Sequence, residues 1–179
     1  MNATSTITRH SAADLIYDAI YIAGVGGGIV ALFFLGYDVL TRHDPFFTPS
    51  LMGSVLFEGL SADSVRSVSM TAVAKFTLIH FAVFSLLGLG LSWLTHQAEI
   101  RSRHPALVIG LVFATLELGF WIGASVLTPG LLEQIGVVPV ATANLLAAVG
   151  IGLFVVGTHR PEVWARFRRG AHLSHGPRA

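Results

Sequence analysis

Three polar residues lie within otherwise apolar stretches of the sequence and have the clearest potential for chemistry. Glu117 lies in LVFATLELGFW, His80 in KFTLIHFAVF and Asn144 in VATANLLAAVG. A carboxylate at the centre of a bilayer costs about 3 kcal/mol on insertion scales, so it must be protonated or paired inside the protein. We expect His80 to be the main partner of Glu117. Asn144, Thr77 and Thr115 are the further hydrogen-bonding candidates.

Two roles are open for this polar cluster. In the first, Glu117, His80 and Asn144 join three helices through hydrogen bonds that contribute about 0.6–2 kcal/mol each in a membrane. In the second, the same residues form a proton relay, a ligand anchor or a metal site. The metal version has weak support, because one histidine and one carboxylate do not complete a site and the Glu-x-x-His pairs of di-iron bundles are missing. The sequence identifies no cofactor and no catalytic constellation.

The surrounding elements follow from composition and from the length of the apolar stretches. Of 179 residues, 53% are hydrophobic and 12% are charged, against about 25% charged in a typical soluble domain. Four apolar stretches cover residues 16–40, 72–94, 106–127 and 138–157, and helices of about 20–25 residues cross a hydrocarbon core of about 30 Å. The stretches lack period-2 alternation, and in lipid the backbone must then satisfy itself as helix. We therefore predict an all-α, polytopic membrane protein, a four-transmembrane-helix bundle that forms one domain over residues 1–179.

The placement of basic residues predicts the orientation in the membrane. With four spans, the N-terminus, the second connection and the C-terminus share one side. That side holds eight of the eleven basic residues, and the other side holds Arg42, Arg66 and Lys75. Basic residues favour the cytoplasm. We predict a multi-pass protein of the cell inner (plasma) membrane, with both termini and a basic tail at residues 158–179 in the cytoplasm.

The first connection contains a segment, TPSLMGSVLFEGL, that predicts a short amphipathic helix at the outer surface. Thr48 is the expected N-cap and Pro49 the first helical residue. The apolar face of this helix is expected to hold Leu51, Met52, Val55 and Leu56. We expect the helix to lie on the outer interface or to fold back over the bundle, either as a simple cover or as a lid or docking surface.

Charged residues flank the outer ends of the first two spans. Asp38, His43, Asp44 and Lys75 are expected to be interfacial charges in contact with solution. A cation or substrate vestibule that leads to His80 is the alternative.

Small residues recur every four positions in several spans. Examples are Gly24-x-x-x-Gly28, Ala23-x-x-x-Gly27-x-x-x-Ala31, Gly110-x-x-x-Ala114, Gly119-x-x-x-Gly123 and Asn144-x-x-x-Ala148-x-x-x-Gly152. Helices associate in membranes through such small residues, which allow backbones to approach closely. One compact bundle does not need all of these stripes. We therefore expect a homo-oligomer or a larger membrane complex.

These observations lead to three functional hypotheses. The leading one is a non-enzymatic accessory or structural subunit of a membrane complex or homo-oligomer. The alternatives are a small transporter or proton-coupled carrier that uses Glu117 and His80, and a membrane redox or lipid-modifying enzyme with His80 as ligand or base. The chain has the general look of four-span bacterial membrane proteins, but no motif identifies a named family. Its partner is the lipid bilayer, and the basic run of the tail is too short and too close to a span to predict nucleic-acid binding.

Overall fold

The computed structural model describes residues 12–97, 105–127 and 130–159, and the ordered elements in these ranges are all helical. The helices are α1 (Ala12–Arg42), α2 (Phe47–Glu58), the short 3₁₀ helix η1 (Ala62–Ser64), α3 (Met70–Gln97), α4 (Pro105–Leu127), α5 (Leu131–Ile135) and α6 (Val137–His159). The predicted all-α class is therefore confirmed for these residues.

Three of the helices are long and apolar enough to cross a membrane. The qualifying stretches are Ile16–Arg42 in α1, Met70–Ser92 in α3 and Val137–Phe154 in α6. They coincide with the first, second and fourth predicted spans. The corresponding apolar part of α4, Ile109–Ser125, is shorter, so the count of four spans stays a prediction. Most of the predicted basic tail, residues 160–179, lies outside the described residues.

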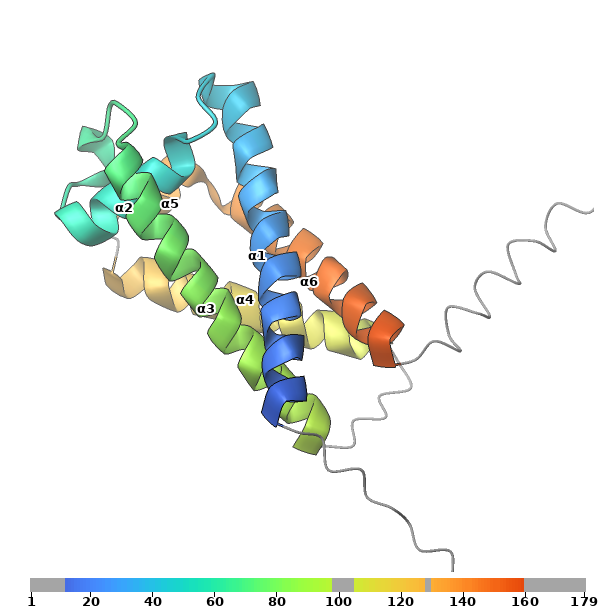
Figure 1. Cartoon of the computed structure of the whole chain (residues 1–179). Coiled ribbons are helices and arrows are strands. Elements are labelled where there is room, and N and C mark those ends of the chain that lie inside the picture. Colours follow the sequence, from blue (N-terminus) through green and yellow to red (C-terminus); the bar gives the residue numbers. More distant parts are fainter. Residues whose placement is uncertain (1–11, 98–104, 128–129, 160–179) are drawn as a thin grey trace, which may run out of the picture.

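The long helices pack in the order α3, α1, α6, α4. The extensive contacts are those of α1 with α3, α1 with α6, and α4 with α6, while α2 packs against α3. Figure 1 shows α1 crossing both α3 and α6, with α4 lying obliquely behind them. In the described residues α3 and α4 do not form an extensive contact. The first and last helices of this row, α3 and α4, therefore leave an opening between them.

Glycine allows the closest of these helix contacts. A Cβ atom on Gly88 of α3 would lie 2.5 Å from the backbone oxygen of Ala19 on α1. A Cβ atom on Gly53 of α2 would collide with the backbone of Ala72 on α3. At these two points the backbones touch without an intervening side chain, as expected for helices that associate by close packing.

The three short helices α2, η1 and α5 form a layer at one end of the molecule, which we call the short-helix layer (Figure 1). Its core contains Leu51 of α2, Ala62 of η1, Leu131 and Ile135 of α5, and Val140 at the start of α6. A second core cluster joins all four long helices: its fully or nearly buried members are Ile22, Leu91, Val112, Ala148 and Ile151. One core thus holds the long helices, and the other fixes the layer at their end.

The start and the buried side of α2 differ from the sequence prediction. The helix begins at Phe47, its N-cap residue is Phe46, and no side chain caps it locally. Thr48, predicted as the N-cap, is the second residue of the helix. The buried residues are Thr48, Ser50, Leu51, Gly53 and Ser54. Small residues are buried here because α2 packs directly on the backbone of α3 at Gly53. The buried hydroxyls of Thr48 and Ser50 bond to Asp38 of α1 and to Ser69 before α3.

Candidate functional site

Glu117 and Asn144 meet where α4 packs on α6. The side-chain amide of Asn144 donates a hydrogen bond of 2.9 Å to Oε1 of Glu117. The indole Nε1 of Trp121, one turn further along α4, donates to Oε2 of Glu117 at 3.1 Å. Asn144 is 7% exposed and Glu117 is half-buried. Both carboxyl oxygens therefore accept hydrogen bonds, one within α4 and one across the helix contact.

His80 lies at a different helix contact, between α3 and α1. Its Nε2 is 3.1 Å from the backbone oxygen of Gly27, and because a carbonyl only accepts, the ring donates. The imidazole also lies among phenylalanines of its own helix, with ring centroids 4.9 Å from Phe84 and 5.7 Å from Phe76. A Cβ on Gly27 would already be in contact with Phe84 and His80. Glycine at this position thus lets the ring lie against the α1 backbone.

The two predicted threonine partners bond to their own helices. The hydroxyl of Thr77 donates to the oxygen of Val73 at 2.8 Å, and the hydroxyl of Thr115 donates to the oxygen of Leu111 at 2.9 Å. Of the five residues predicted to form one polar cluster, the structure brings together Glu117 and Asn144. His80, expected to pair with Glu117, bonds to Gly27 instead.

Asp38 corrects a further expectation. Predicted as an interfacial charge in solution, it is 0% exposed. Its carboxylate accepts a hydrogen bond of 2.6 Å from the backbone N–H of Thr48 and one of 2.7 Å from the Thr48 hydroxyl. The first turn of a helix has unpaired N–H groups and a partial positive charge. Asp38 of α1 therefore caps α2 from another helix, which explains why α2 lacks a local capping side chain.

Other polar contacts attach the short-helix layer to the long helices. Arg42 of α1 donates to the oxygen of Gln134 in α5 at 2.7 Å, and its guanidinium lies 4.5 Å from the ring centroid of Phe47. The hydroxyl of Ser50 in α2 accepts a 2.8 Å hydrogen bond from the N–H of Ser69, the residue before α3. These contacts, like that of Asp38, join elements to one another. They favour a structural role for the outer polar residues, which hold the helices together, over the alternative of a vestibule that leads to His80.

The same end of the molecule carries exposed charged groups. Lys75 of α3 and Glu58 of α2 form an ion pair of 3.7 Å, and both side chains are partly exposed. His43 is exposed and has a positive φ of 59° at the turn after α1, and the Asp44 carboxylate accepts the N–H of Phe46 at 3.0 Å. Within the described residues, no group of three or more His, Cys, Asp or Glu side chains is arranged to hold a metal ion.

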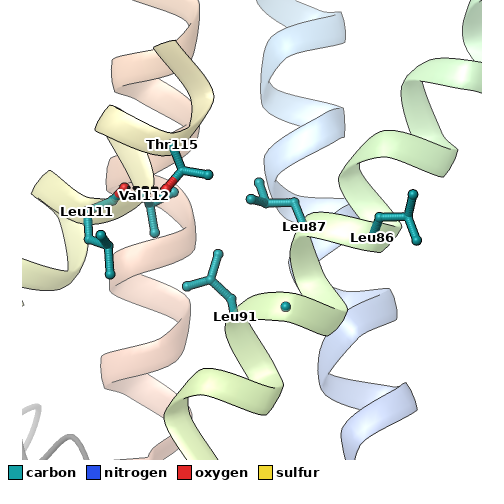
Figure 2. A pocket seen from close by; sticks show the side chains of 7 residues that line it. Leu86, Leu87, Leu91, Leu111, Val112 and Thr115 are labelled. Carbon is teal, nitrogen blue, oxygen red and sulfur yellow. Dashed lines mark hydrogen bonds between the residues drawn. The ribbon is translucent and has the colours of Figure 1, made fainter. Parts of the chain in front are cut away.

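A cleft opens between α3 and α4, where the row of long helices is not closed. It has a volume of about 300 Å³ and is lined by Leu86, Leu87, Gly90 and Leu91 of α3 and by Leu111, Val112 and Thr115 of α4. Figure 2 shows Leu87 and Leu91 of α3 projecting toward α4, on which Leu111, Val112 and Thr115 lie. This cleft could not be predicted from the sequence, because a gap between two apolar helices has no signature in their residues.

Trp121 is the other functional candidate that sequence reasoning missed. It follows Glu117 by four residues, a spacing that places two side chains on one face of a helix, so the indole–carboxyl contact could have been predicted. The partner of His80 carried no such signal, since every residue has a backbone carbonyl. No protein-family model, curated protein or solved structure matches this chain.

Proposed function

We propose that this chain is a non-enzymatic integral membrane protein that acts as an accessory or structural subunit of a homo-oligomer or larger membrane complex. In this proposal it lies in the inner (plasma) membrane with four spans and with both termini in the cytoplasm. The long apolar helices and the bias of basic residues support this placement.

The observation that carries the proposal is an unused surface of small residues on α1. Gly24 and Gly28 lie one turn apart, and a Cβ atom on either would meet no atom within 4 Å. The neighbouring stripe packs inside the molecule, since Ala23 and Gly27 are buried against other helices. The internal packing thus uses one of two parallel stripes and leaves the other facing outward. A second helix that approaches this face would find the close contact that small residues permit.

The outer face of α4 adds to this support. Among the described elements, α4 packs extensively only with α6. On its opposite side Gly110, Ala114 and Gly119 are exposed, together with Leu118 and Ile122. A helix held on one side in this way has a large apolar face free for lipid or for another subunit.

The hydrogen bonds of the interior favour this role over a proton-coupled carrier. The carrier hypothesis needed Glu117 and His80 to form a pair at membrane depth. Glu117 instead bonds to Asn144 and Trp121, and His80 bonds to the backbone of Gly27. Each polar group therefore joins helices at its own crossing point, which is what a structural role requires.

The subunit proposal predicts that bulk on the outward stripe of α1 weakens assembly. We expect native mass spectrometry in mild detergent to detect oligomers or complexes of the unaltered chain and to show their loss in Gly24→Leu and Gly28→Leu. Gly36→Leu is the comparison variant, because Gly36 is also exposed on α1 with open space around it but lies two turns beyond Gly28, away from the Gly24–Gly28 contact surface. A chain that is monomeric under all mild conditions, without bound protein partners, contradicts the proposal.

A further inference from the structure

Glu117 places a carboxyl group near the middle of α4. The residue lies close to the midpoint of this 23-residue helix, so in the proposed four-span topology its carboxyl group lies deep in the hydrocarbon core. Within the described residues, Glu117 contacts Asn144 and Trp121 and forms no ion pair. The charge of this carboxylate therefore has no counter-ion in the part of the chain that the structure describes.

Both hydrogen-bond partners of Glu117 fit a carboxylate. The amide of Asn144 donates to Oε1, and the indole of Trp121 donates to Oε2. A protonated acid would bring an O–H donor of its own, and neither of these two N–H groups can accept it. Neutral donors fill the lone pairs of a carboxylate but do not cancel its charge, and a charge inside the bilayer is costly unless it is paired. A cation from outside the chain would supply what the two hydrogen bonds do not.

The carboxyl group is accessible along one edge of α4. Glu117 is half-buried, and Trp121, which binds its second oxygen, is 38% exposed. Gly110 and Ala114 are exposed on the same edge, because residues i, i+4, i+7 and i+11 follow one line along a helix. A Cβ atom on Gly110 would meet no atom within 4 Å. Small residues let a second helix approach closely, so a partner helix at this edge would bring its side chains to the carboxylate.

A second copy of this chain does not offer a suitable cation. Lys75 is the only lysine or arginine in the four predicted spans. It lies in the second turn of α3, beside the short-helix layer, and pairs there with Glu58. His80 lies deeper, but its Nε2 is bonded to Gly27 at an internal helix contact. The cation must therefore come from a different protein. Arginine suits this role best, because its guanidinium stays protonated in apolar surroundings and binds carboxylates through several donors.

We propose that the edge of α4 formed by Gly110, Ala114, Glu117 and Trp121 binds a transmembrane helix of another protein that carries an arginine at the depth of Glu117. The inference rests on the proposed function as a subunit of a membrane complex, and it adds the chemistry of the partner. The ion pair neutralises the carboxylate in a medium of low dielectric constant, where the attraction between opposite charges is strong. The small residues of the edge set the distance at which the two helices pack.

The test uses the full chain in phosphatidylcholine vesicles and a synthetic polyleucine peptide that spans the bilayer and carries one central arginine. Energy transfer between a labelled Ser174→Cys chain and the labelled peptide measures association. We expect the arginine peptide to bind about tenfold or more tightly than an identical peptide with leucine at its centre. Glu117→Gln should remove this preference, because glutamine keeps an oxygen for the Asn144 amide and lacks the charge.

Two further comparisons separate charge from packing. Trp121→Phe removes one hydrogen bond but keeps the carboxylate, so the preference for the arginine peptide should persist. Gly110→Leu should block binding of this peptide. Gly119→Leu is the matched control, because Gly119 also has open space around it but lies nearly opposite Glu117 around the helix axis. Circular dichroism identifies the variants that remain folded.

Several results would overturn the assignment of an arginine-bearing partner. These are equal binding of the two peptides, an undiminished preference in folded Glu117→Gln, and loss of the preference in folded Trp121→Phe. Equal effects of Gly110→Leu and Gly119→Leu would show that the partner does not bind along the edge of Glu117. Because Gly24 and Gly28 are unchanged in all of these variants, failure here leaves the subunit proposal standing.

Discussion

One hydrogen bond between a carboxyl group and an amide joins α4 to α6, beside the apolar packing of the two helices. Within the described residues α4 has extensive contact only with α6, and the hydrogen bond from Asn144 to Glu117 spans that contact at 2.9 Å. Without Asn144, Glu117 keeps the indole of Trp121 but loses the partner of Oε1, and without Glu117 the Asn144 amide loses its acceptor on α4. Loss of one member leaves the other unsatisfied, whereas loss of both removes that penalty. The energy of the hydrogen bond between Glu117 and Asn144 should therefore appear as non-additive effects of the two single substitutions on the free energy of unfolding.

We predict that Glu117→Leu and Asn144→Leu are coupled in a double-mutant cycle. The expected coupling is about 0.6–1.7 kcal/mol, which runs from the average to the maximum found for hydrogen bonds between membrane helices. Unfolding in mixed detergent micelles, followed by circular dichroism, gives the four stabilities. A parallel cycle of Glu117→Leu with Thr142→Val is the control, because the Thr142 hydroxyl bonds within α6 to Val138. Additive effects in the first cycle would contradict the observed pairing.

The residue-level contacts differ in how far the sequence could predict them. Glu117 and Asn144 were predictable, because a polar side chain in an apolar span has few partners and must find one. The partner of His80 was not, since the oxygen of Gly27 is available only because two helices cross at a glycine. Asp38 was misassigned to solution because its burial requires α2 to return across the end of α1. That geometry depends on the turn at residues 43–46, and the local pattern around Asp38 does not encode it.

At the scale of the helices, the lengths of the apolar stretches predicted where helices form. The sequence did not predict which face of each helix packs inward. Runs of about 20 residues predict helices, because length and hydropathy are local properties. Which stripe of small residues faces inward is a property of the whole arrangement. Gly24 with Gly28 and Ala23 with Gly27 have the same spacing, yet only the second pair is buried. The glycines of α3 show the same contrast within two residues, since Gly88 touches the backbone of α1 and Gly90 faces the cleft.

We predict opposite effects for alanine at these two positions of α3. Gly88→Ala should lower the free energy of unfolding by about 1–3 kcal/mol, because its Cβ forces α3 away from the rigid backbone of Ala19. Gly90→Ala should leave the stability unchanged or raise it by up to about 1 kcal/mol, since alanine favours helix and the new Cβ meets open space. Micelle unfolding measures both variants under identical conditions. Equal effects at the two positions would show that α1 and α3 do not meet at Gly88 as described.

At the scale of the whole molecule, the position of the short-helix layer fixes the direction in which each long helix runs. Arg42, the last residue of α1, bonds to Gln134 in α5, and Leu51 of α2 shares a core with Leu131 of α5. The C-terminal end of α1, α2, α5 and the start of α3 thus lie together at one end (Figure 1). Helix α3 runs away from that end over 28 residues. The chain must therefore return through α4 before it reaches α5, and the 23 residues of α4 reach about 34 Å at 1.5 Å per residue.

This route predicts an even number of crossings, which labelling can test because the chain contains no cysteine. Asp63→Cys introduces a thiol at an exposed position of η1, and Ser174→Cys introduces one in the C-terminal tail. A membrane-impermeant maleimide added to intact cells should label the first and not the second. After permeabilisation both should react, which controls for thiol reactivity. If α4 did not cross the bilayer, α6 would carry the tail to the side of η1, and both thiols would be labelled in intact cells. That result would leave three crossings and would place the cleft of α3 and α4 at the membrane surface.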